Sequence, residues 1–207
     1  MYHLVDARIE AYAERMSSPH DALLAELSEQ STRALGSAGM LTGPVAGRFL
    51  ELLVWITQPQ RVLEIGTFSG HSALAMAAGL PAGGRIDACE LDPARASFAQ
   101  SWFDRSPHGS KITLHVGPAL DTVRSLEGAF DFVFIDADKP GYVDYYDEVL
   151  PRLSERGLIV ADNTLSGGDV VDGNPPIAAF NEHVAADPRS IQVLLTVRDG
   201  LTLIRRA

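Results

Sequence analysis

The feature that most constrains the fold of this chain is an apolar strand that runs into a glycine turn. Residues 61–70 read RVLEIGTFSG, and a helix-like stretch, HSALAMAAGL, follows directly. A second strand-like run, RIDACE at 85–90, ends on Glu90, 20 residues after Gly70. This layout is typical of a nucleoside-binding βαβ unit, in which glycines let the ligand approach the backbone and the distal acid accepts hydrogen bonds from ribose hydroxyls.

The spacing of the glycines narrows the kind of ligand. The turn reads G-x-x-x-G rather than G-x-G-x-x-G, and no G-K-[ST] follows it, so a dinucleotide or a nucleoside triphosphate is disfavoured. Glu64, inside the preceding strand, would repel a pyrophosphate and suits a cationic ligand, such as the amino-acid end of S-adenosylmethionine. The alternative is a doubly wound fold in which the glycine turn is structural and Glu90 lies at the surface.

From residue 61 onward, strand-like and helix-like segments alternate, which predicts a parallel sheet covered by helices on both faces. We expect strands at 61–65, 85–90, 112–116, 130–135 and 157–161, and helices at 70–79, 93–104, 118–126, 140–153 and 175–186. The end of the chain differs, because 191–197 and 201–205 flank an Asp-Gly pair that favours a hairpin turn. The sheet should therefore finish with an antiparallel hairpin.

The residues before this unit are predicted to be helical. Residues 1–35 have Leu23, Leu24 and Leu27 on one helical face, and a second apolar helix is expected over 47–56, after a glycine-rich break at 36–44. At 207 residues the chain fits one domain, with N-terminal helices in 1–56 and the core in 61–207.

Composition limits the partners. A net charge of −10, from 17 Lys and Arg against 27 Asp and Glu, disfavours nucleic acid and anionic membranes, because no basic patch is evident. The sequence contains no run of about 18 apolar residues, so we expect no membrane span. The N-terminus lacks an apolar signal core, so we expect a cytoplasmic enzyme. The single cysteine, Cys89, excludes an internal disulfide.

Polar side chains also follow two later strands. FDFVFID ends on Asp136, and LIVADN ends on Asp162 and Asn163. Because the carboxyl ends of parallel strands face one crevice, we expect these three side chains to converge there. Oxygen ligands without Cys or His indicate a hard cation, Mg²⁺ or Ca²⁺, rather than structural zinc. The alternative is that they cap the helices that follow.

Lys139 stands three residues after Asp136 and should point back toward the same crevice. Near a dication, in a partly desolvated site, its charged form is disfavoured, so it could act as a general base. The alternative is a solvated lysine at the start of a helix. Asp138 is a further candidate, either as a cation ligand or as the N-cap of the helix that opens at Pro140.

Six motifs resemble, in order, those of the cation-dependent O-methyltransferases of the caffeoyl-CoA type, which are related to catechol O-methyltransferase. They are RVLEIGTFSGHSAL, ACELDP, VGPAL, FDFVFIDADKPGY, GLIVADNTLSGG and VRDGLTLIRR, and the resemblance covers residues 20–207. It implies a Rossmann-like class I methyltransferase fold, a seven-stranded sheet with a reversed last hairpin, and a homodimer. It also implies S-adenosylmethionine as donor and a divalent cation, Mg²⁺ before Mn²⁺ or Ca²⁺.

The resemblance assigns roles to individual residues. Asp136, Asp162 and Asn163 match the metal ligands, and Lys139 matches the lysine that deprotonates the acceptor in the catechol enzyme. Glu90 matches the ribose-binding acid. The positions that match the donor site are Met40, Thr42, Glu64, Gly66, Ser72, Glu90, Gly117, Pro118, Ala119 and Asp136.

Within the donor set, Ser72 is placed for the methionine carboxylate, residues 117–119 lie beside adenine, and residues 40–42 close over the donor. Two positions depart from the family, because His71 stands where a Tyr is usual and Phe68 replaces an aromatic hydroxyl of some members. The segment after Asn163, TLSGGDVVDGNPP, has no aromatic residue, so a bulky CoA ester is not implied as acceptor.

The expected activity is methyl transfer from S-adenosylmethionine to a catechol-like small molecule, with natural-product tailoring as one setting. Lys139 would take the proton of a cation-bound phenol, and the phenolate would attack the sulfonium methyl. A tRNA hydroxyuridine O-methyltransferase is a rival that the net charge of −10 disfavours. A non-catalytic S-adenosylmethionine-binding module is disfavoured because the four residues of the expected metal and base site are all present.

Overall fold

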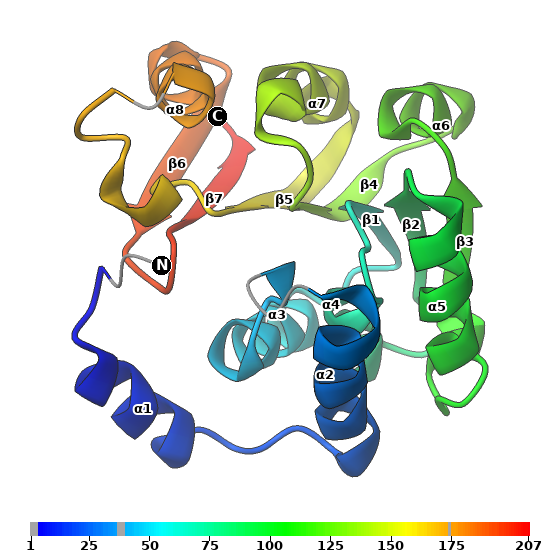
Figure 1. Cartoon of the computed structure of the whole chain (residues 1–207). Helices are drawn as coiled ribbons and strands as arrows, with labels where there is room; N and C mark the ends of the chain where they lie inside the picture. The colour runs from blue at the N-terminus through cyan, green and yellow to red at the C-terminus, as the bar shows by residue number, and fades with distance from the viewer. Residues whose placement is uncertain (1–3, 37–39, 174) are drawn as a thin grey trace.

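A twisted sheet runs through the middle of the molecule, with helices on both of its faces (Figure 1). The structure is a computed structural model, and it describes residues 4–36, 40–173 and 175–207. The sheet consists of β1 (Arg61–Ile65), β2 (Arg85–Glu90), β3 (Ile112–Val116), β4 (Phe130–Ile135), β5 (Leu153–Asp162), β6 (Ser190–Leu195) and β7 (Leu201–Arg206). Their order across the sheet is β3-β2-β1-β4-β5-β7-β6, which confirms the predicted fold class.

The strand order places a ligand-binding edge at the carboxyl ends of β1 and β4. β1 pairs in parallel with both β2 and β4, so the chain first moves outward to β3 and then crosses back to the other side of β1. Doubly wound sheets bind ligands at such a switch point. β7 runs antiparallel to β5 and β6 runs antiparallel to β7, as the Asp-Gly hairpin signal predicts.

Each face of the sheet carries its own apolar core. One face is covered by α2 (Ala22–Leu35), α3 (Pro44–Thr57), α4 (His71–Gly79) and α5 (Pro93–Phe103), and the other by α6 (Ala119–Ser125), α7 (Tyr142–Val149) and α8 (Pro175–Ala186). Successive residues of a strand enter opposite cores, as Val62 and Leu63 do in β1. Because both faces are covered, these strands read as continuous apolar runs rather than as an alternation.

Several predicted boundaries differ from those observed. The helix expected over 140–153 is a short 3₁₀ turn η3 (Lys139–Gly141), α7, and a second turn η4 (Leu150–Arg152), because Pro140 and Pro151 interrupt the α-helical bonding. β5 begins four residues earlier than expected, and its pairing with β4 shifts register between Phe130 and Phe132. Two further 3₁₀ turns are η2 (Gly109–Lys111) and η5 (Ser166–Gly168).

The first helix, α1 (Ala7–Met16), stands away from the sheet (Figure 1). None of its ten residues is buried, and Ile9, Tyr12 and Met16 are each more than half exposed. The helical stretch expected over 1–35 is thus broken between α1 and α2, and residues 1–3 lie outside the described ones. Part of the predicted glycine-rich break, 37–39, also lies outside them. Among the described residues, no helix is both long and apolar enough to cross a bilayer.

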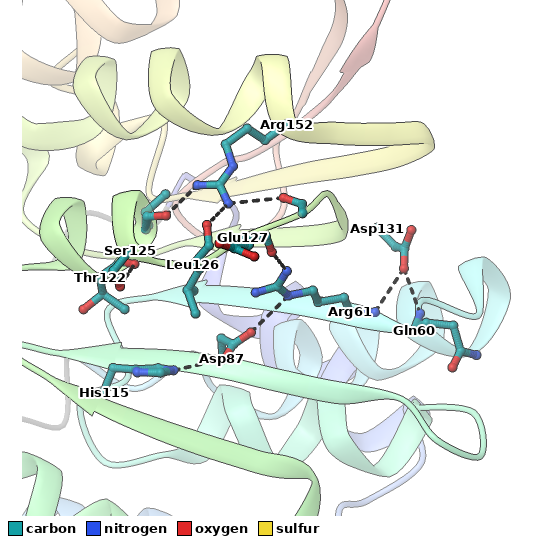
Figure 2. Close-up of polar contacts among 12 residues, drawn as sticks. Gln60, Arg61, Asp87, His115, Thr122, Ser125, Leu126, Glu127, Asp131 and Arg152 are labelled. Carbon is teal, nitrogen blue, oxygen red and sulfur yellow. Dashed lines mark hydrogen bonds and ion pairs between the residues drawn. The ribbon is translucent and has the colours of Figure 1, made fainter.

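A polar network ties the strands together at the end of the sheet opposite the switch point (Figure 2). Asp131 of β4 accepts hydrogen bonds from the backbone N–H groups of Gln60 and Arg61, both at 3.0 Å. The Arg61 guanidinium donates to Asp87 of β2 at 3.2 Å, and His115 of β3 contacts the same carboxylate at 2.9 Å. These contacts connect β1 with its neighbours β2 and β4, and none of the residues that make them lines the cavity described below.

Candidate active site

A cavity of about 690 Å³ lies at the carboxyl ends of the parallel strands. Of the residues predicted for the site, those that line it are Met40, Gly66, Glu90, Gly117, Pro118, Ala119, Asp136, Lys139, Asp162 and Asn163. Thr42 and Ser72 line a narrow second cavity that shares Met40, Gly66 and Asp136 with the first. The structure therefore brings together residues that are spread over more than 120 positions of the sequence.

Glycine is required at the first turn by a close approach of two strands. Gly66 has φ +94°, and a Cβ placed there would lie 2.1 Å from the carbonyl oxygen of Asp136. The Asp136 N–H donates to the Ile65 carbonyl at 2.9 Å, which extends the β1–β4 pairing into the turn. A side chain at position 66 would push apart the two strand ends that form the cavity floor.

Glu90 is buried and holds the loops beside the cavity. Its Oε2 accepts the backbone N–H of Phe68 at 2.7 Å, and its Oε1 accepts that of Asp92 at 2.9 Å. Each carboxylate oxygen has a second lone pair, so both can still accept hydroxyl protons from a ligand in the cavity. The position is that expected for an acid that binds ribose.

Glu64 lies behind the cavity wall rather than in it. Its oxygens accept hydrogen bonds from Thr67 Oγ1 at 2.7 Å and Ser72 Oγ at 2.6 Å. Burial raises the pKa of Glu64 to about 7, although the two hydroxyls oppose the shift. A hydroxyl has one proton, so Ser72 cannot also donate to a ligand carboxylate while it donates to Glu64. A direct contact of either residue with the donor stays a prediction.

Lys139 lies at the centre of a polar cluster on the β4 and β5 side. Its Nζ donates to Asn163 Oδ1 at 2.8 Å and to Tyr142 Oη at 2.6 Å, and it lies 3.3 Å from Asp136 Oδ1. Tyr142 in turn donates to the Asp162 carbonyl at 3.0 Å. The sequence interpretation missed Tyr142, although its spacing of three residues from Lys139 places it one turn along the chain.

Asp162 is the most deeply buried acid of this cluster, with 1% of its surface exposed. Its Oδ1 accepts the Asn163 N–H at 2.7 Å, whereas its Oδ2 has no hydrogen-bond partner among the described residues. Burial, and next the charge of Asp136, raise the pKa of Asp162 to about 7, while Arg198 opposes the shift. A buried carboxylate oxygen without a partner is costly, and a bound cation would satisfy it.

The donor set for a cation consists of two carboxylates and one amide. Among the residues that the structure describes, no three His, Cys, Asp or Glu side chains gather as ligands, so a site here depends on the Asn163 oxygen. Asp138 also lines the cavity, and its Oδ1 accepts the Tyr145 hydroxyl at 2.6 Å. It occupies the N-cap position of η3, but no side-chain capping bond is present there. Oxygen-only ligands match Mg²⁺, Mn²⁺ or Ca²⁺.

Backbone conformations of high energy concentrate at this cavity. Five non-glycine residues have positive φ in the described part of the chain, and Phe68, Asn163 and Arg198 all line the cavity. Such residues persist where the surrounding structure holds them, and they cluster at functional sites. Arg198 was not among the predicted site residues, because the sequence marks its segment only as a hairpin turn.

Comparison with known proteins identifies O-methyltransferases as relatives of this chain. A family model described as O-methyltransferase matches residues 14–207. A catechol O-methyltransferase of Niastella koreensis is 44% identical over 162 residues, which cover 74% of this chain and 71% of that protein. Caffeoyl-CoA O-methyltransferase 1 of Eucalyptus globulus is 35% identical over 186 residues, covering 81% of this chain and 75% of that protein.

The solved structures that resemble this chain are also methyltransferases. An SAH-bound methyltransferase of Podospora anserina has a TM-score of 0.91 at 30% identity, covering 97% of this chain and 94% of that chain. The O-methyltransferase TomG of Streptomyces achromogenes, involved in tomaymycin synthesis, was solved with SAM. It has a TM-score of 0.85 at 29% identity and covers 97% of this chain and 96% of that chain.

The fold is thus that of the class I methyltransferases, with the reversed terminal hairpin. The chain belongs to the O-methyltransferase family. The predicted family and the predicted enzyme class, an S-adenosylmethionine-dependent O-methyltransferase, are both confirmed.

Proposed function

We propose that this chain transfers the methyl group of S-adenosylmethionine to one hydroxyl of a catechol-like aromatic small molecule, in a reaction that depends on a divalent cation. The observation that carries the proposal is the cluster at the carboxyl ends of β4 and β5. There one amine, Lys139 Nζ, lies 3.3 Å from Asp136 Oδ1 and 2.8 Å from Asn163 Oδ1, in the cavity that Asp162 also lines.

The donor would occupy the β1–β2 side of the cavity. Glu90 would accept the ribose hydroxyls, and residues 117–119, at the end of β3, would lie beside adenine. Met40 would cover the donor from the segment before α3. A cavity of about 690 Å³ falls within the range of small-molecule sites and is large enough for a nucleoside together with a small aromatic ring.

Asp136, Asp162 and Asn163 would hold the cation, because their side chains line the same cavity and Asp162 Oδ2 has no hydrogen-bond partner among the described residues. A cation bound there supplies Lewis acidity toward a phenolic oxygen. The residues of the chain would remove the proton and align the acceptor. Lys139 Nζ, placed among these oxygens, takes the hydroxyl proton in its neutral form, and the cavity walls hold the phenolate oxygen in line with the methyl group.

The acceptor class is supported by the relatives and by the segment that follows Asn163. The Niastella relative, at 44% identity, is a catechol O-methyltransferase. The segment that follows Asn163 contains no aromatic residue up to residue 176, which gives no platform for the bulky thioester of the plant relative. A vicinal dihydroxy compound of small size is therefore the acceptor we expect. Natural-product tailoring is a compatible setting, as for the Streptomyces neighbour.

We also propose that the chain forms a homodimer. α1 exposes Ile9, Tyr12 and Met16, and α3 exposes Leu52 and Trp55. A helix of ten residues is marginal in water unless an apolar face packs against something, and α1 buries none of its residues within one chain. A second copy would supply the missing surface.

The test is methyl transfer from labelled S-adenosylmethionine to a panel of catechols and matched monophenols. We expect methylation of vicinal diols only, loss of turnover in excess chelator, and recovery with Mg²⁺ or Mn²⁺. Full turnover in chelator would refute the cation requirement, and equal methylation of monophenols would refute the proposed acceptor class.

A further inference from the structure

Arg198 reaches from the β6–β7 hairpin across the cavity to a segment far away in the sequence. Its guanidinium donates to the carbonyl oxygens of Leu41, at 3.0 Å, and Thr42. Its Nη1 also lies 3.9 Å from Asp162 Oδ2, the carboxylate oxygen without a hydrogen-bond partner. One side chain thus contacts both the segment before α3 and the end of β5.

The segment that Arg198 holds forms part of the donor side of the cavity. Met40 and Leu41 line the main cavity, and both with Thr42 line the narrow one beside Ser72. A Cβ placed on Gly43 would be 3.6 Å from the guanidinium carbon, so the arginine packs along this segment as well as bonding to it. Backbone carbonyl oxygens in a loop need hydrogen-bond donors, and here the planar guanidinium group of Arg198 supplies them.

The backbone at Arg198 does not favour an arginine. Its φ is +49°, a left-handed conformation that costs little for glycine and more for a residue with a Cβ. The turn would therefore form more easily without this side chain. A residue kept against its local preference is expected where its side chain has another role.

We propose that Arg198 is a positioning residue that fastens residues 41–43 over the donor and joins that segment to the Asp162 side of the cavity. This inference rests on the proposed function, because it takes the cavity beside the segment as the donor site. Donor affinity should then depend on a residue that acts through the segment rather than through the donor. No step of the methyl transfer itself is assigned to Arg198.

The left-handed turn provides a variant that separates this role from folding. Arg198→Gly removes the guanidinium but suits φ +49°, so the hairpin should be as stable as in the wild type or more so. Arg198→Lys keeps the charge but cannot bond two carbonyl oxygens with one planar group. Arg205→Ala is the matched control, because Arg205 is an exposed arginine of the same hairpin.

The measurements are the calorimetric affinity for the product S-adenosylhomocysteine, the melting temperature of the donor-free protein, and hydrogen exchange of the peptide over residues 40–46. For Arg198→Gly we expect affinity to fall on the order of tenfold, because two charged hydrogen bonds that hold the segment are lost. Ligand-induced protection of residues 40–46 should also be lost, while the melting temperature does not fall. Arg198→Lys should resemble Arg198→Gly, and Arg205→Ala should resemble the wild type.

Several results would overturn the inference. Unchanged affinity in Arg198→Gly would show that the segment needs no such clamp. Full affinity in Arg198→Lys would show that charge alone suffices. A lower melting temperature in Arg198→Gly, with faster exchange across β6 and β7, would mean that Arg198 merely supports the hairpin. A wild-type chain that does not bind S-adenosylhomocysteine would instead refute the proposed function, and this inference with it.

Discussion

Glu64 should make the stability of the donor-free protein depend on pH, and Glu64→Gln should remove that dependence. The carboxyl group is fully buried, and its two contacts are the hydroxyls of Thr67 and Ser72. Hydroxyls can accept as well as donate, so both can turn to meet the amide of a glutamine. The substitution thus keeps the shape and the hydrogen bonds and removes only the titratable proton.

The sign follows from the direction of the shift. Burial raises the pKa of Glu64 from 4.5 to about 7 in the folded chain, so between these values the folded state binds a proton that the unfolded state has released. The stability from this group is complete below 4.5 and is lost as pH rises through 7. Ionising the buried carboxylate costs about 3 kcal/mol, and most of this cost falls between pH 5 and pH 8.

Thermal melts of the wild type and Glu64→Gln across this pH range measure the difference. Relative to the wild type, the variant should gain roughly 5–10 °C in melting temperature between pH 5 and pH 8, for a chain of this size. Glu155→Gln, at an exposed position of β5, is the matched control and should show no such trend. A difference between wild type and Glu64→Gln that stays constant with pH would refute the argument, because it would mean that Glu64 titrates normally.

Three further predictions concern the donor, the base and the assembly. Glu90→Ala should weaken S-adenosylmethionine binding by about 1.5–3 kcal/mol, since a charged acceptor is lost, and unchanged calorimetric affinity would contradict the ribose assignment. Lys139→Ala should lower kcat by about 10²–10⁴ with little change in donor affinity. A near-normal kcat with the same pH–rate profile would show that Lys139 is not the base. Light scattering at micromolar concentration should give twice the 22.3 kDa chain mass, and a single chain mass would argue against the homodimer.

The course of the chain through the sheet was largely predictable from the sequence. Strands buried on both faces give apolar runs, and the glycine turn after β1 and the Asp-Gly before β7 have strong local signals. β1 to β4 were predicted with the bounds that the structure shows. The segment around α7 was less predictable, because prolines at 140 and 151 convert its two ends to 3₁₀ turns. The separate course of α1 was not predictable, since its apolar residues give the same pattern whether or not they meet a core.

The site residues that lie at the ends of strands were predictable from the sequence. Asp162 is the last residue of β5, and Asp136 and Asn163 directly follow β4 and β5, so parallel pairing alone brings the three to the same wall. Contacts that depend on the packing of distant segments left no such signal. Neither the bond of Ser72 to Glu64 nor the reach of Arg198 over 156 positions to Thr42 follows from spacing along the chain.

The left-handed residues indicate where this protein can be stabilised without affecting its chemistry. Gln58, the residue that ends α3, has φ +49° and is exposed, so Gln58→Gly should relieve backbone strain at a position remote from the cavity. Asn163 has φ +57°, and a glycine there would relieve similar strain while deleting the amide oxygen that faces Lys139. On the proposed function, the same substitution by glycine should therefore give a more stable protein at position 58 and a less active enzyme at position 163.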